Sequence, residues 1–246
     1  MQKIILLTVF FFLGMTWGVF LHAQTPAKIE DRIYQAFEQS FVKGANGLES
    51  IIQELEAFYQ SDSKRHWAYW QGYAHYYLSI YHLKTDKKNE ANTTLQKGIQ
   101  ILEGIRDKNS DDYALLGALQ SFSITYNPSE APVLSTKALK NTEKAIELDG
   151  QNLRAYLIAG RNDFYKPEQY GGGKVTEKHL LKALSLKDSY QTDNSYTPTW
   201  GRSEAYALLV QFYQREGRKE EALLFCKQGL QKFPNDYMLN QLQKEL

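Results

Sequence analysis

The sequence predicts an all-α protein built from helical hairpins. Beyond residue 24, apolar residues recur three and four positions apart, which is the spacing of one helix face, and the alternation typical of strands is scarce. The segments "KAIELDGQN" (residues 144–152) and "KALSLKDS" (residues 182–189) look like equivalent ends of the second helix in two such hairpins. These two observations favour a fold of repeated helix pairs, which become stable by stacking on one another.

The composition is that of a folded protein without a preference for nucleic acid. The 246 residues are 43% hydrophobic and 23% charged, enough for one sizeable domain or two small ones. Lys and Arg number 29 against 28 Asp and Glu, and without Lys3 the two counts are equal at 28. A nucleic-acid partner requires a basic surplus, so we expect none.

The first residues have the pattern of a secretory signal. Lys3 precedes an almost uninterrupted apolar run from Ile4 to Leu21, and cleavage is expected between Ala23 and Gln24. The alternative is an uncleaved membrane anchor, because about 18 apolar residues nearly span a bilayer. We expect residues 1–23 to be removed, which leaves an exported, periplasmic protein without a stable membrane span. The only cysteine, Cys226, lies far from the cut, so a lipid anchor at that site is not expected.

The remaining residues, 24–246, are expected to form one helical repeat domain. Five helix pairs are predicted, and a capping helix follows them at 235–246. The pairs are 28–43 with 46–60, 64–84 with 88–105, 111–126 with 132–148, 152–165 with 175–187, and 202–216 with 219–232.

The clearest pair lies at residues 203–236. Its first helix has one apolar stripe and its second helix another, and Pro234 ends the second helix because proline cannot continue the hydrogen-bond ladder. The stripes consist of Tyr206, Leu209, Val210 and Tyr213, and of Ala222, Phe225, Cys226 and Gly229.

This unit resembles a tetratricopeptide repeat in its length and in the order of its large, small and aromatic positions. Val210, Cys226 and Gly229 depart from the usual residues of that pattern. The whole of residues 24–246 is similar to an exported bacterial tetratricopeptide protein with a "YGGGK" insertion. The resemblance implies a right-handed α-α superhelix and a general binding role, and it supplies no substrate.

The insertion "YKPEQYGGGKVT" (residues 165–176) has the composition of a phosphate-binding loop but not its spacing. Such a loop would require glycine at Glu168 and a hydroxyl residue at Val175, placed after a buried strand. We therefore interpret residues 171–173 as a turn that lets the chain reverse. The alternative is an anion site at the start of the next helix, beside Lys174.

No catalytic motif or metal-binding pattern is found in the sequence. His75 and His82 are seven positions apart, about 10.5 Å along a helix, which is too far to share a metal. Cys226 is expected to be a buried, inert thiol. We expect no catalytic residue, no metal and no cofactor.

The resemblance implies that the first helix of each pair lines a concave groove. The Arg, Tyr and Gln side chains of these helices suit a protein or peptide, although they are also compatible with a salt-bridged helix flank. The groove candidates are Tyr113, Gln120, Arg154, Arg161, Tyr165, Glu204, Gln211 and Arg215.

Two connecting segments supply further candidates. Residues 188–201 are too long and polar for an ordinary turn, so they either pack over the edge of the groove or fill a gap between repeats. The loop candidates are Tyr170, Lys174, Tyr196 and Trp200.

The sequence thus predicts a non-catalytic, exported scaffold that binds a protein or peptide of the cell envelope. The alternative is a periplasmic small-molecule-binding component associated with a transporter. That alternative predicts a closed pocket lined by Tyr170, Tyr196 or Trp200.

Overall fold

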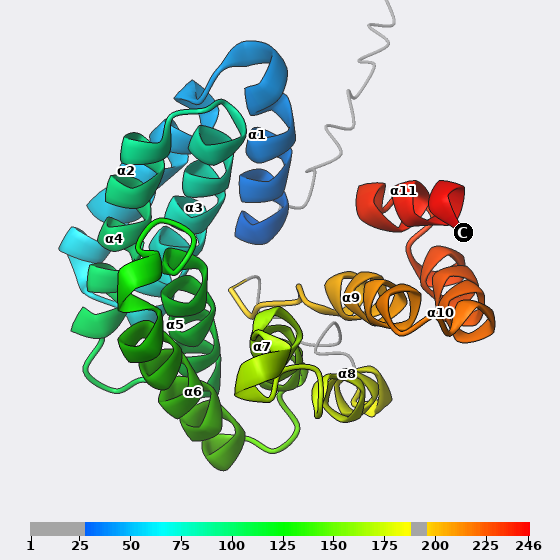
Figure 1. Cartoon of the computed structure of the whole chain (residues 1–246). Helices are drawn as coiled ribbons and strands as arrows, with labels where there is room; N and C mark the ends of the chain where they lie inside the picture. The colour runs from blue at the N-terminus through cyan, green and yellow to red at the C-terminus, as the bar shows by residue number, and fades with distance from the viewer. Residues whose placement is uncertain (1–27, 188–195) are drawn as a thin grey trace, which may run out of the picture.

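The computed structural model describes residues 28–187 and 196–246, and in these residues the predicted all-α fold is confirmed (Figure 1). Every helix is followed by another helix, and the described residues contain no strand. The α-helices are α1 (Ile29–Lys43), α2 (Asn46–Asp62), α3 (Arg65–Lys84), α4 (Lys88–Gly104), α5 (Ser110–Ser123), α6 (Ala131–Leu148), α7 (Leu153–Tyr165), α8 (Thr176–Ser185), α9 (Arg202–Arg215), α10 (Lys219–Lys232) and α11 (Tyr237–Glu245).

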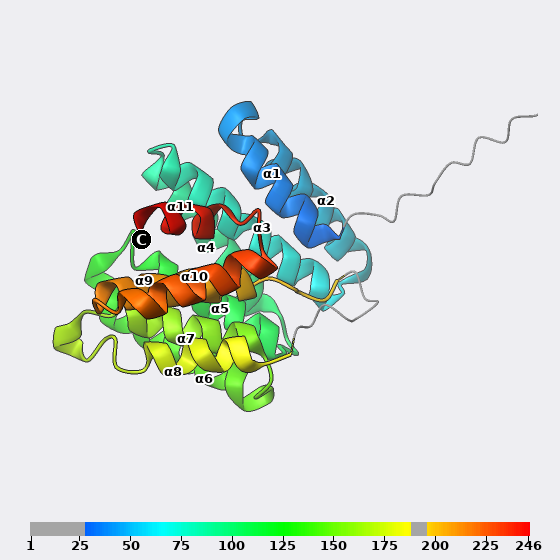
Figure 2. The ribbon, with the colours of Figure 1, turned by 90° about the vertical axis from the view of Figure 1, so that its right-hand side faces the viewer.

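The helices stack as a solenoid. Each α-helix packs against the next one along the chain, and the odd-numbered helices α1, α3, α5, α7 and α9 also pack against one another in order. We call these five the inner helices and α2, α4, α6, α8 and α10 the outer helices. Figure 1 shows α1–α6 on one side of the molecule and α7–α11 on the other, and in Figure 2 the side with α9, α10 and α11 faces the viewer. Helix α11 packs on α9 and α10, as expected for a cap.

Small residues allow the helices of a pair to approach closely. A Cβ atom on Gly72 would lie 2.8 Å from Cγ of Leu102, and one on Gly160 would lie 2.8 Å from Cδ2 of Leu180. Both glycines therefore allow the backbone of an inner helix to contact a leucine side chain of the outer helix directly, so that no space is left between them.

The aromatic residues of α3 form much of the core. Tyr69 and Trp70 are fully buried and pack edge to face, and Trp70 continues in the same geometry onto Tyr73. These aromatic residues therefore serve packing. Tyr73 and Tyr77 also reach a cavity, as described below.

The three glycines of residues 171–173 form a turn between α7 and α8. Gly171 and Gly173 have φ angles of 84° and 81°, which favour glycine. Gly172 has a different requirement, because a Cβ atom there would lie 1.8 Å from the carbonyl oxygen of Lys166. The segment before the turn is the helix α7 and not a strand, so the structural context of a phosphate-binding loop is missing.

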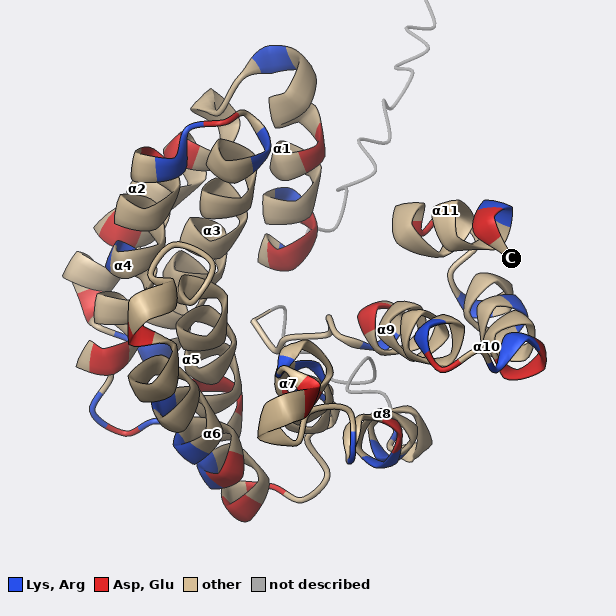
Figure 3. Cartoon of the chain, in the orientation of Figure 1, with Lys and Arg blue, Asp and Glu red and all other residues tan. Residues whose placement is uncertain are grey.

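The expected signal at residues 1–23 and most of the 188–201 segment lie outside the described residues. Within residues 28–187 and 196–246, no helix is long and apolar enough to cross a membrane. In the view of Figure 3, positive and negative residues are mixed over most helices, as their nearly equal numbers predict.

Candidate functional site

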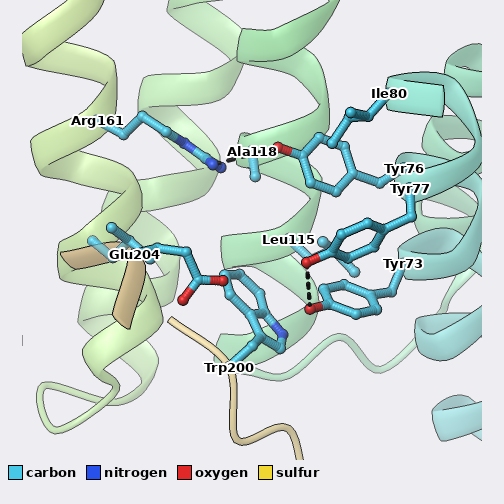
Figure 4. A pocket seen from close by; sticks show the side chains of 10 residues that line it. Tyr73, Tyr76, Tyr77, Ile80, Leu115, Ala118, Arg161, Trp200 and Glu204 are labelled. Carbon is cyan, nitrogen blue, oxygen red and sulfur yellow. Dashed lines mark hydrogen bonds between the residues drawn. The ribbon is translucent and has the colours of Figure 1, made fainter. Parts of the chain in front are cut away.

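A cavity of about 100 Å³ lies where α3, α5, α7 and the start of α9 meet (Figure 4). We call it the central pocket. It opens on the inner helices, so it belongs to the surface that the sequence assigned to binding. The lining residues are Tyr73, Tyr76, Tyr77, Ile80, Leu115, Ala118, Leu157, Arg161, Trp200 and Glu204.

Helix α3 supplies the aromatic wall. Tyr73, Tyr76 and Tyr77 lie three and four positions apart, which places their rings on one helix face. The hydroxyl groups of Tyr73 and Tyr77 are hydrogen-bonded at 3.3 Å. Trp200 stacks on Tyr73, with the ring centroids 5.6 Å apart. The wall is therefore apolar in its rings and polar at its hydroxyl edge.

Trp200 is held in place by the segment that precedes α9. Its indole N–H donates a hydrogen bond of 2.8 Å to the hydroxyl of Tyr69. The neighbouring Thr199 donates from its backbone N–H and its side chain to the carboxylate of Glu30 on α1. This segment thus ties α1, α3 and α9 together beside the central pocket.

Arg161 provides the positive charge of the pocket. Its Nη1 lies 3.5 Å from the hydroxyl oxygen of Tyr76, to which it donates a long hydrogen bond. Among residues 28–187 and 196–246, no carboxylate lies within ion-pair distance of Arg161. The Tyr76 hydroxyl is therefore the one hydrogen-bond acceptor that the described residues offer this guanidinium.

Glu204 provides the negative charge but is already engaged. Its carboxylate accepts a hydrogen bond of 2.9 Å from the backbone N–H of Gly201 and another from the hydroxyl of Ser203, as the cap of α9. Burial raises the pKa of Glu204, and the nearby Asp236 raises it further. In Figure 4, Glu204 reaches toward Trp200, while Arg161 reaches toward Tyr76.

An acidic region borders the pocket on the side of α1 and α11. Tyr34 on α1 has its pKa raised to about 12, mainly by burial and further by the charges of Glu38, Asp236 and Glu204. These three carboxylates come from α1, the start of α11 and the first turn of α9. These carboxylates therefore lie near Tyr34, whose ring packs on the pocket residue Tyr77.

Of the groove candidates, the structure places Arg161 and Glu204 in the central pocket, Arg154 and Gln120 inside helix interfaces, and Tyr113 at the seam between α5 and α6. Arg154 is buried and pairs with Asp111 at 2.8 Å. Gln120 is buried between α4 and α6, where it bonds to Glu103 and Asn141. Tyr113 lies against α6, beside Lys140 and Lys144. The expected position on the groove surface is wrong for Arg154 and Gln120, because both side chains are buried between helices. Tyr113 is half-buried, and its role in binding stays a prediction.

The other groove candidates lie toward the edges of the inner surface. Tyr165 is exposed at the end of α7, with its ring against Phe164. Arg215 stacks over Phe164 at 4.2 Å and donates to its carbonyl oxygen. Gln211 contacts the sulfur of Met238 on α11. None of these three lines the central pocket.

The four loop candidates lie in different places. Trp200 lines the pocket, whereas Tyr196 stacks on His66 with the ring centroids 4.4 Å apart. Tyr170 and Lys174 are exposed at the turn before α8. The pocket lining expected for a small-molecule binder is therefore found for Trp200 alone.

The sequence candidates do not include the three pocket tyrosines, because aromatic residues three and four positions apart on a helix have the same spacing as a packing face. In the described residues, no group of three metal-binding side chains is found. Cys226 is buried, and burial raises the pKa of its thiol.

Comparisons with known proteins support the fold. No protein-family model matches the sequence, and no curated protein matches it. The HusA haemophore from Porphyromonas gingivalis is similar in structure, with a TM-score of 0.55 and 19% identity over 78% of this chain and 96% of that one. The tetratricopeptide protein TTC0263 from Thermus thermophilus has a TM-score of 0.53 and 16% identity over 88% and 97% of the two chains.

At these identities the likeness shows the fold alone. Together with the stacked helix pairs, it places this chain in the class of tetratricopeptide-like helical solenoids.

Proposed function

We propose that the chain is an exported, non-catalytic scaffold that binds a segment of a protein or peptide of the cell envelope along its inner helices. The observation that carries this proposal is the central pocket, which combines tyrosine and tryptophan rings with an arginine that has no acidic partner in the described residues. Tyrosine, tryptophan and arginine are the residues that most often anchor protein interfaces.

The size of the pocket favours one anchored side chain over a whole small molecule. Pockets for drug-sized ligands measure about 300–1,000 Å³. The central pocket measures about 100 Å³. A group of a few heavy atoms fills that space, which is the size of an amino-acid side chain.

Exposed aromatic residues extend the surface beyond the pocket. On α1, Tyr34 is 40% exposed and Phe41 50% exposed. Both rings pack edge to face on α3, Tyr34 against Tyr77 and Phe41 against Tyr81. The residues that flank an anchored side chain would therefore find apolar contacts along α1.

Export and the absence of catalysis rest on the sequence. The apolar run after Lys3 supports export, and the lack of a catalytic motif supports a binding role. A scaffold with a preformed pocket requires neither a cofactor nor a catalytic group.

The second candidate is a binding protein for a small aromatic molecule, associated with a transporter. Trp200 on the pocket wall favours it, and the structurally similar HusA is described as a haemophore. This candidate requires the pocket to widen several-fold, because a porphyrin does not fit in about 100 Å³. A thermal shift with haem that disappears in Trp200→Ala would support it.

A photocrosslinking experiment tests the main proposal. The crosslinking residue p-benzoylphenylalanine replaces Ile80, which lines the pocket, or Leu139, which is exposed on the outer helix α6. We expect discrete protein adducts in intact cells from position 80 and not from position 139. Equal adducts from both positions, or no adduct from position 80, would contradict the proposal.

The substitution that accompanies the crosslinking experiment is Arg161→Ala, made without any change at Arg154. A double variant that includes Arg154 would lose a buried ion pair and fold poorly, so it would not report on binding. Arg161 makes a single long hydrogen bond, so its removal leaves the fold intact.

A further inference from the structure

The end of the central pocket formed by Arg161 and Tyr76 has the chemistry of a carboxylate site. We infer that this end binds the side-chain carboxylate of an aspartate or glutamate in the partner segment. The inference deepens the proposed function and rests on it, since it names the group that the scaffold anchors.

Arg161 has no acidic partner within the described residues, whereas several other buried or half-buried arginines have one. Arg65 pairs with Asp112 at 2.8 Å, and Arg218 pairs with Glu177 at 2.9 Å. Arg161 has only the Tyr76 hydroxyl at 3.5 Å. A guanidinium carries five N–H donors in a planar fork that matches a carboxylate. Most of the donors of Arg161 therefore have no acceptor among the described residues.

The hydroxyl of Tyr76 adds a second donor. A guanidinium cannot accept a hydrogen bond, so Tyr76 must accept from Arg161, and its own proton is free to be donated. In Figure 4, the guanidinium and this hydroxyl approach each other from α7 and α3 at the same end of the pocket. A carboxylate placed there would accept from both groups.

The rest of the pocket selects for size and charge. Ile80, Leu115 and Ala118 provide an apolar lining for methylene groups. Glu204, at the other end, would repel a second anion while it is ionised. The site therefore suits one carboxylate on a short aliphatic stem, which is the side chain of aspartate or glutamate.

A partner segment satisfies the site better than a free acid does. A free acid fills only the pocket, whereas a segment also covers the exposed rings of Tyr34 and Phe41. Those flanking contacts supply the apolar burial that an isolated ion pair lacks.

Propionate and propionamide test the chemistry of the pocket, because they reproduce the side chains of glutamate and glutamine. Nuclear magnetic resonance would follow the Nε–Hε signal of Arg161 in the whole exported chain. We expect saturable shifts with millimolar propionate and at least tenfold weaker binding of propionamide. Equal binding of the two probes, or no saturable shift up to about 100 mM propionate, would overturn the inference.

Two variants provide the matched comparison, with the signals of Tyr76 and Ala118 as the readout. Arg161→Lys keeps the charge but loses the planar fork, so propionate should still bind, several-fold more weakly. Arg161→Gln should abolish the preference for propionate over propionamide. A preference that persists in Arg161→Gln would place the carboxylate elsewhere. Unchanged thermal melting of both variants verifies that they fold.

The crosslinking experiment separates this inference from the proposed function. If position 80 captures a partner equally well in Arg161→Gln, the scaffold function stands and the carboxylate inference falls. If position 80 captures nothing, the scaffold function falls, while the propionate titration still decides the chemistry of the pocket. When a partner is captured, the acidic residue in its crosslinked segment can be replaced by the corresponding amide, which should reduce capture at least tenfold. Blocking the terminal carboxylate of the partner should leave capture unchanged.

Discussion

Thr199 donates two hydrogen bonds to the carboxylate of Glu30, at 2.7 Å from its backbone N–H and 2.9 Å from its hydroxyl. The two residues are 169 positions apart, so this contact joins the first inner helix to the segment that leads into α9. The same segment carries Trp200, which lines the central pocket. The position of Trp200 in the central pocket therefore depends on a contact between α1 and the segment before α9.

Replacing Glu30 by alanine should destabilise the protein by about 2–4 kcal/mol, because two buried donors on Thr199 lose a charged acceptor. Chemical denaturation monitored by circular dichroism measures the loss. The control is Glu54→Ala, which breaks the half-exposed ion pair with Arg32 and should cost less than about 1 kcal/mol. Equal losses in the two variants would show that Glu30 is not a structural link.

Replacing Gly172 by alanine should destabilise the protein by about 3 kcal/mol or more, because the new Cβ would overlap the backbone carbonyl of Lys166. A backbone atom cannot move aside as a side chain can. The control is Gly104→Ala at the end of α4, where no atom lies within 4 Å of the added Cβ, and stability should change by less than about 1 kcal/mol. Similar melting temperatures for the two variants would refute the described turn.

Acid should destabilise the protein through His75. Burial lowers the pKa of His75 from 6.5 to about 4, and its Nδ1 has no hydrogen-bond partner in the described residues. Between these two pH values the unfolded chain binds a proton that the folded chain does not, so stability is lost as the pH falls from about 6.5 to about 4. The loss from this residue is about 3 kcal/mol at most.

Denaturant unfolding at pH 7.5 and pH 4.5 measures this effect. In His75→Gln the difference between the two pH values should be smaller than in the wild type. A residual difference is expected, because burial also lowers the pKa of His66, His82 and His179. An unchanged pH dependence in His75→Gln would assign the effect to other groups.

The sequence predicted the helices well because their ends depend on local chemistry. Pro167 prevents α7 from continuing, and residues 171–173 permit the reversal into α8. The spacing of three and four between apolar residues then defines the face of each helix that packs. These signals involve neighbours in the chain, so a single sequence contains them.

The pocket could not be predicted in the same way because it depends on how distant helices meet. Tyr76 and Arg161 are 85 positions apart, and only the stacking of α3, α5 and α7 brings them together. Arg154 lies on the same face of α7 as Leu157 and Arg161, which line the pocket. It is nevertheless buried, because it pairs with Asp111 at the start of α5, and the spacing along one helix does not reveal a partner on another.

The central claim is that the inner helices are the binding surface. Hydrogen–deuterium exchange of the purified chain, alone and with the partner captured at position 80, tests it most directly. The account predicts slower exchange in α3, α7 and the start of α9 and unchanged exchange in α4, α6 and α8. Protection confined to these outer helices, or none in α3 and α7, would contradict the account.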